Sequence, residues 1–146
     1  MNVVEVLEGR YLPLLNQAAL RLRERHPTFA VNVGSGAVGS ATSFQGHHVY
    51  LEALRPESAD PEPNCIALEI CVRDLPGTPT LCSLDVSWGA DGISPSEGSD
   101  LLAAETAFTP EALRRIDEAL PRLETHLDRC LYDWEAAYPQ TPKVPQ

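Results

Sequence analysis

The apolar residues of this chain change their spacing twice, and this pattern constrains the fold more than any other feature of the sequence. Residues 3–25 repeat apolar side chains every three or four positions, as one face of a helix does. Between residues 29 and 88 the apolar positions alternate with polar ones, which is typical of strands. From Leu113 to Trp134 the helical spacing returns. The pattern predicts a helix, then strands, then a second helix.

Prolines and a capping residue indicate how the two helices are built. Gly9 and Pro13 interrupt the first helix, and its strongest part should start near Pro13, because proline is tolerated in a first turn. The second helix should begin after Thr109, which is a good N-cap, with Pro110 in the first helical position. Pro121 lies off the apolar stripe, so we expect it to kink this helix and leave the stripe intact.

The middle of the chain predicts four or five strands that are joined mostly by short turns. The clearest are residues 65–73 and 80–88, on either side of a turn at Pro76-Gly77. Strands that are neighbours in sequence usually pair antiparallel. Two amphipathic helices can cover only one face of such a sheet. We therefore expect an α+β fold, with a mostly antiparallel four- to five-stranded sheet and an N-terminal and a C-terminal helix packed on one face.

The register of the clearest strand pair can be argued, because a slip of one residue would swap the two faces of the sheet. Pairing Ile70 with Leu84 produces one fully apolar face. The same register places Glu69 directly opposite Asp85 on the other face, where like charges are unfavourable. If Val49, Leu51 and Ala53 of the preceding strand point to the core, the residues between them face the other way. The polar face then carries Tyr50, Glu52, Glu69 and Asp85.

The charge of the chain is strongly negative and is concentrated in its middle. The formal net charge is −10, and residues 27–108 hold only Arg55 and Arg73 against eleven acidic residues, a net −9. Nucleic acid and anionic membrane surfaces would both repel this segment. We therefore expect neither as a partner, and consider a basic protein partner instead.

The composition predicts a cytoplasmic protein of one domain. No stretch approaches the roughly 20 apolar residues of a membrane span, and the first residues lack the pattern of a signal peptide. The four cysteines show no C-x-x-C spacing, so we expect free thiols in the core. The domain should cover residues 1–138, followed by a flexible tail at 139–146. The sequence leaves open whether it is a monomer or a homodimer.

Two motifs are better explained by structure than by function. Residues 34–39 match G-x-G-x-x-G, but the residues after them do not predict the helix that would hold a pyrophosphate, so we interpret the segment as a glycine-rich bend. His47-His48 could offer a metal ligand. Adjacent strand residues point to opposite faces, so at most one of the two could join a given site. We assign no metal, no cofactor and no catalytic residue.

Three functions remain open on this sequence. Small acidic α+β domains without catalytic motifs are common among inhibitors and immunity-type proteins, an analogy of class alone. The first hypothesis is thus a non-enzymatic binding protein whose acidic sheet face meets a basic protein. The second is a small metal-dependent enzyme that uses Glu52, Glu69 and Asp85. The third is a small-molecule-binding domain with a pocket between the sheet and the loop at 89–108. An acidic face that only maintains solubility is the ordinary alternative.

Overall fold

The computed structural model describes residues 2–40, 44–55, 65–74, 76–77, 79–88 and 106–137. The first helical segment comprises α1 (Val3–Val6), the π-helical turn η1 (Leu7–Tyr11) and α2 (Leu12–Arg25). The strands are β1 (Ala30–Ser40), β2 (Phe44–Leu54), β3 (Cys65–Asp74), β4 (Leu81–Trp88) and β5 (Thr106–Ala107). The last helix is α3 (Pro110–Ala137).

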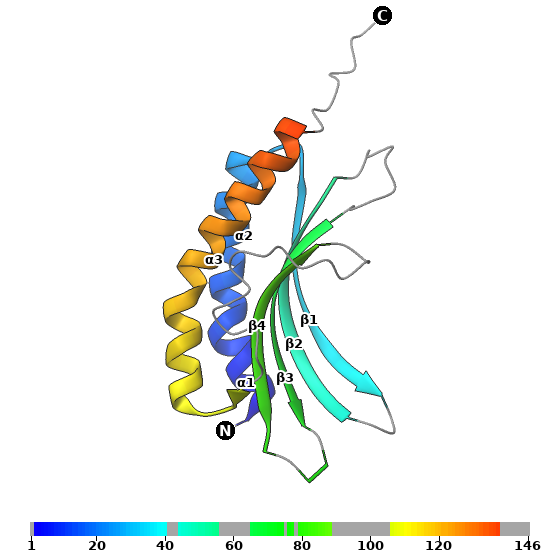
Figure 1. The fold of residues 1–146 in the computed structure, drawn as a ribbon, viewed down its shortest axis with the longest axis vertical. Coiled ribbons are helices and arrows are strands. Elements are labelled where there is room, and N and C mark those ends of the chain that lie inside the picture. Colours follow the sequence, from blue (N-terminus) through cyan, green and yellow to red (C-terminus); the bar gives the residue numbers. More distant parts are fainter. Residues whose placement is uncertain are drawn as a thin grey trace, which may run out of the picture.

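The strands form one antiparallel sheet in the order β1-β2-β3-β4-β5, with every strand beside its neighbours in sequence. Both long helices pack against the same face (Figure 1). The predicted α+β architecture is therefore confirmed. The predicted register is confirmed as well, since Ile70 pairs with Leu84 and Glu69 pairs with Asp85.

The two long helices lie side by side and run in the same direction (Figure 1). Helix α2 covers β1 and β2, whereas α3 covers β3 and β4. Polar contacts join them along their length. Arg21 of α2 makes two hydrogen bonds to Glu124 of α3, at 2.8 and 2.5 Å. Further along, the ring of His26 lies 2.7 Å from the carboxylate of Asp128.

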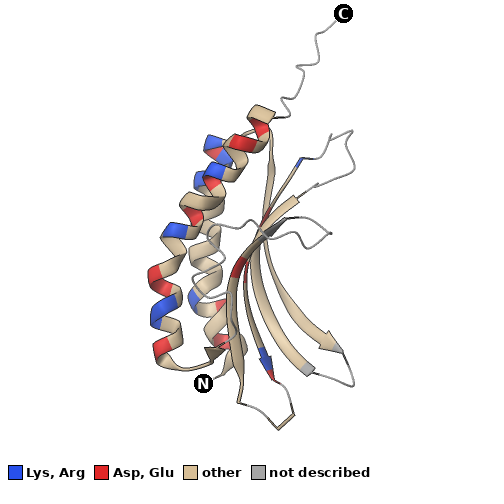
Figure 2. Ribbon diagram, viewed as in Figure 1, with Lys and Arg blue, Asp and Glu red and all other residues tan. Residues whose placement is uncertain are grey.

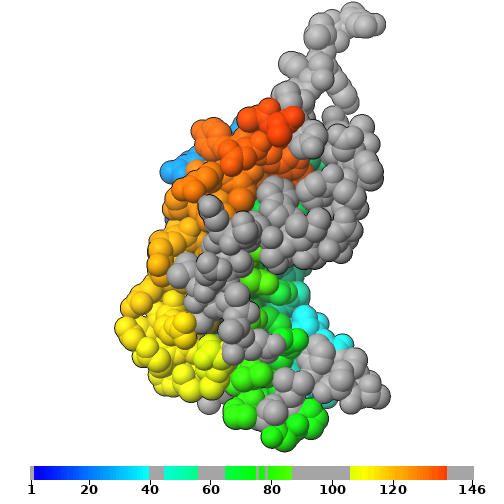
Figure 3. All heavy atoms as spheres, in the orientation of Figure 1, coloured from blue at the N-terminus to red at the C-terminus, as the bar shows by residue number. Residues whose placement is uncertain are grey.

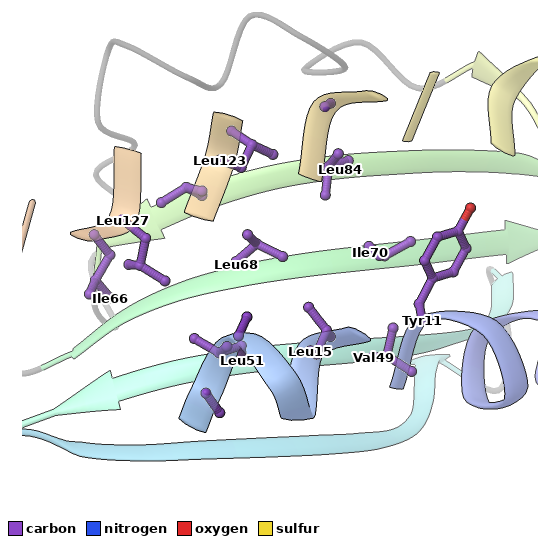
Figure 4. Close-up of a cluster of buried hydrophobic side chains, with 14 of the residues drawn as sticks. Tyr11, Leu15, Val49, Leu51, Ile66, Leu68, Ile70, Leu84, Leu123 and Leu127 are labelled. Carbon is purple, nitrogen blue, oxygen red and sulfur yellow. The ribbon is translucent and has the colours of Figure 1, made fainter. Parts of the chain in front are cut away.

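The core lies between the helices and the sheet, where the alternating residues of the strands meet the stripes of the helices (Figure 4). Leu51, Leu68 and Leu84 project from three neighbouring strands, and each is almost fully buried. Leu123 and Leu127 of α3 pack onto them and are fully buried. The stripe predicted on the last helix therefore belongs to the core. All four cysteines are free thiols.

The longest part of the first helix starts near Pro13 as predicted, since α2 begins at Leu12. The interruption before it differs from the expectation, because the backbone stays helical there. Proline has no N–H to give, and its ring clashes with the carbonyl four residues earlier, that of Gly9. The chain meets this constraint with a π-helical turn, in which the Leu12 N–H bonds to the Leu7 carbonyl five residues back. Helical backbone thus runs on through the positions where an interruption was expected, and α-helical geometry resumes at Leu12.

The glycine-rich segment also differs from its prediction. It is not a bend, because β1 runs continuously from Ala30 to Ser40 and pairs with β2 along that length. The next described element is β2, a strand, so no helix follows to support the nucleotide-binding motif.

The start of the last helix agrees with its prediction. The Thr109 hydroxyl accepts a hydrogen bond from the Ala112 N–H at 3.2 Å, and α3 begins at Pro110. Just before it, the two-residue strand β5 lies at the end of the segment that was expected to be a loop. The expected flexible tail at 139–146 falls outside the described residues. None of the described helices is long and apolar enough to cross a membrane.

Candidate functional site

The face of the sheet turned away from the helices, here called the outer face, is curved. The strands bend so that this face is concave (Figure 1), and the surface of the molecule is indented beside the strands in the space-filling view (Figure 3). The sheet register places the four candidate binding residues on this face: Tyr50, Glu52, Glu69 and Asp85. All four are partly buried.

Glu69 lies at the centre of this group. It pairs with Tyr50 across β2 and with Asp85 across β4. Its carboxylate also lies 2.6 Å from Nδ1 of His48, which makes a hydrogen bond between neighbouring strands. The sequence did not suggest this contact, and it offered His48 only as a candidate metal ligand. It did imply that His47 and His48 face opposite ways, and in the structure His47 lies instead beside Glu8 of the helical segment, 3.4 Å away.

The hydrogen bond between His48 and Glu69 does not remove the cost of placing a negative charge on Asp85. The pKa of Asp85 is raised above the ordinary value, first by burial and then by the negative charge of Glu69. The same surroundings act on Cys71, which is the next residue of β3 after Glu69 that faces outward. Burial and then Glu69 raise the pKa of that thiol to about 11, so it carries almost no thiolate at neutral pH. The outer face is therefore a place where negative charge is disfavoured.

Two aromatic rings lie across the first strand on this face. Tyr50 and His48 of β2 have ring centroids 5.0 Å apart. The ring of Tyr50 occupies the space above Gly34, where a Cβ would lie 2.6 Å from Cζ of the tyrosine. Gly36 stands opposite His48, and its own added Cβ would meet that ring at 3.8 Å. The glycine at position 34 is thus explained by packing, since only glycine lets the ring lie flat on the strand.

The charge of the outer face depends on few residues. Most charged side chains of the described residues lie on the helices, and the strands are largely uncharged (Figure 2). Of the eleven acidic residues between 27 and 108, four lie in the described segments: Glu52, Glu69, Asp74 and Asp85. Three of them, Glu52, Glu69 and Asp85, lie on the outer face, and Arg73, two residues beyond Cys71 on β3, adds one positive charge to the same face.

The metal-binding hypothesis gains no support from the geometry of these residues. Glu52 is opposite Ala67, diagonal to Glu69, so the three carboxylates follow the sheet surface across three strands. Among the described residues, no group of three or more His, Cys, Asp and Glu side chains is placed to hold a metal ion. A divalent cation requires several oxygen ligands around one point.

A second feature, which the sequence did not suggest, is a cavity of about 240 Å³ between α2 and α3. Its floor is formed by Leu51 and Leu68 of the sheet, and Leu14, Ala18 and Leu127 are among its apolar walls. The small side chain of Ala18 helps to leave this space open. The third hypothesis placed a pocket against the loop at 89–108, which is mostly outside the described residues, so that expectation stays a prediction.

Three charged residues also line the cavity. Arg21 and Glu124 are bonded to each other across it. Asp117 gives one carboxylate oxygen, Oδ2, to an ion pair with Arg10. Its other oxygen, Oδ1, is buried and makes no close hydrogen bond within the described part of the chain, and the Asp117 carboxylate also raises the pKa of the neighbouring Tyr11 through its charge and side-chain hydrogen bonding. In the sequence, arginines of the first helix and acidic residues of the last helix lie at the edges of the two apolar stripes. This pattern is consistent with ion pairs between the helices, but it does not predict a cavity between them.

Comparison of the chain with models of protein families, with curated proteins and with solved structures found no match in any of the three.

Proposed function

We propose that this chain is a cytoplasmic, non-enzymatic binding protein, and that its outer sheet face meets the basic surface of a partner protein, as inhibitors and immunity-type proteins do. The observation that carries the proposal is the opposition of Glu69 and Asp85 on a concave face that neither helix covers. Directly opposed carboxylates disfavour the strand pair. A cationic partner would remove that cost on binding.

The neighbouring residues support the same surface. Tyr50 offers an aromatic ring, a kind of side chain that is enriched in protein interfaces. Its ring is held over Gly34, so it loses little freedom on binding. Burial already raises the pKa of Asp85, so part of the desolvation of this carboxyl has occurred before a partner arrives. A metal-dependent enzyme has less support, because the three carboxylates are spread over three strands.

The proposal can be tested with a defined cationic probe. The probe is a short peptide of alternating arginine and alanine, and its control has every arginine replaced by glutamine. Amide signals from β2, β3 and β4 should shift in nuclear magnetic resonance spectra with the arginine peptide. The affinity should fall between about 0.01 M and about 0.15 M salt, because the screening length falls from about 30 to about 8 Å.

A matched pair of variants separates the outer face from net charge. Glu69→Gln with Asp85→Asn removes two negative charges from this face, and Glu111→Gln with Glu118→Gln removes two from the exposed side of α3. The first pair should weaken peptide binding and the second should leave it nearly unchanged. Equal weakening by both pairs would show that only overall charge matters, and the proposal would then be wrong.

A further inference from the structure

Strand β1 forms one edge of the described sheet (Figure 1), and its sequence leaves that edge open. It contains no charged residue and no proline, although the chain as a whole has a net charge of −10. Proteins usually protect edge strands with charges, prolines, bulges or a very short length, because the unpaired backbone groups of an edge can bind another strand. The opposite edge of the described sheet follows this rule, since β5 has only two residues. Another strand can therefore add at β1.

We propose that β1 pairs antiparallel with β1 of a second copy of this chain, around a twofold axis at Ser35. The two sheets then form one continuous sheet, in which the outer faces of both copies lie side by side. This inference goes beyond the proposed function, because the pairing requires no basic partner.

Two features mark the ends of the open part of the edge. At one end, Arg23 of α2 donates two hydrogen bonds to the Val31 carbonyl, at 3.0 and 2.6 Å, so this backbone group is already engaged. At the other end, Gly39 has a φ of 127°, which lies outside the range of a regular strand. The regular, open part is therefore residues 32–38. When two such segments pair antiparallel and every residue finds a partner, the axis lies at the midpoint, Ser35.

This register is self-complementary on both faces of the sheet. On the face toward the helices, partly buried Val33 lies opposite exposed Ala37 of the second copy, and Ser35 lies opposite Ser35. On the outer face, Gly34 of one copy lies opposite Gly36 of the other, so no side chain separates the two backbones. Like charges that oppose each other would disfavour the pair, but this strand has none to bring together.

The aromatic rings of the outer face support the same register. The ring of Tyr50 lies over Gly34, and His48 stands opposite Gly36, with 5.0 Å between the two ring centroids. Neighbouring strands of a sheet are about 4.8 Å apart. With Gly34 opposite Gly36 of the second copy, the Tyr50 ring of one copy comes next to the His48 ring of the other. The pairing thus adds aromatic contacts, which are enriched in interfaces, to the backbone hydrogen bonds.

The oligomeric state of the full chain is the first test. One short strand pair buries a small area, so we expect a weak dimer, with a dissociation constant between about 1 µM and about 1 mM. In sedimentation equilibrium, the mass should rise from 15.9 kDa toward twice that value over this range of protein concentration. A mass of 15.9 kDa at every concentration would overturn the proposal.

Cysteine substitutions test the position of the axis. In Ser35→Cys, the two thiols belong to directly opposed residues, whose Cα atoms are about 4.5–5.5 Å apart in an antiparallel pair, within the range that a disulfide spans. Oxidised glutathione should therefore convert this variant to a covalent dimer, as two thiols are oxidised and the glutathione disulfide is reduced to two thiols. Asn32→Cys, which is also exposed on β1 but lies away from the axis, should stay monomeric on denaturing gels, as should the unchanged chain. Equal cross-linking of both variants, or none in Ser35→Cys, would overturn the register.

A charge on the edge tests whether β1 is the interface. Ala37→Lys adds the residue that natural edge strands most often use against pairing, and should raise the dissociation constant at least about tenfold. Ala136→Lys makes the same change at an exposed residue of α3 and should leave the dissociation constant unchanged. Thermal melts at low concentration check that both variants fold. If the two lysines weaken the dimer equally, the contact lies elsewhere and the proposal is wrong.

Discussion

Truncation of two buried leucines in α3 gives the most direct test of the packing. Leu123 and Leu127 are both fully buried, one turn apart. The change to alanine removes three carbon atoms, a loss of about 2.4 kcal/mol at about 0.8 kcal/mol each, and the void left behind adds to this. For Leu123→Ala we expect the free energy of unfolding to fall by about 3–5 kcal/mol.

Leu127→Ala should cost less, about 2–3 kcal/mol, because Leu127 lines the cavity and already lacks packing partners on that side. Urea denaturation measures both values, with Leu20→Ala as the control. Leu20 is 61% exposed on α2, so the same chemical change there should cost no more than about 0.5 kcal/mol. If Leu127→Ala costs as much as Leu123→Ala, the void beside Leu127 does not exist. If neither variant changes stability, the stripe of α3 is not in the core and belongs to an oligomer interface.

Three further predictions concern the outer face and the thiols. Asp85→Asn should stabilise the chain by roughly 0.2–1 kcal/mol at neutral pH by removing the repulsion from Glu69. Because the pKa of Asp85 is raised in the folded state, this gain should shrink as the pH falls through that pKa, and a gain that persists in acid would contradict the electrostatic cause. Gly34→Ala should destabilise the wild-type chain by up to about 2 kcal/mol, because the added methyl group displaces the ring of Tyr50. The same change should be harmless in a Tyr50→Ala background, and Gly36→Ala should cost less because it meets no close contact. Equal destabilisation by both alanines in thermal melts would count against the packing argument. Titration of the denatured, unreduced chain should find four thiols, and a count of two would mean a disulfide.

The sheet could be predicted from the sequence because its register is a local problem. Ile70 must share a face with Leu68 and Val72, and a slip of one residue against the next strand would move its apolar residues to the polar face. The same argument placed Glu69 opposite Asp85 and brought Tyr50 and Glu52 to their side. All of these positions are observed.

The features that were missed depend on contacts between distant residues. The role of Gly34 becomes clear only when Tyr50 of the next strand lies across it, and the local glycine pattern by itself predicts a bend. The cavity depends on which side chains face Ala18 across two helices, and no period in either helix reveals that. The hydrogen bond from His48 to Glu69 depends on rotamers as well as register, and a strand pattern carries no information on rotamers.

The pairing of the two long helices has a consequence for the order of folding. The strands join partners that are close along the chain, whereas Arg21 and Glu124, or His26 and Asp128, are more than a hundred residues apart. Contacts at such separations are entropically costly to close and tend to form late. Because α3 follows every strand in the chain and covers β3 and β4, the apolar side of those strands should stay uncovered until synthesis has passed residue 137. A nascent chain that stops short of this helix should therefore be a substrate for chaperones and proteases, even with most of its sheet complete.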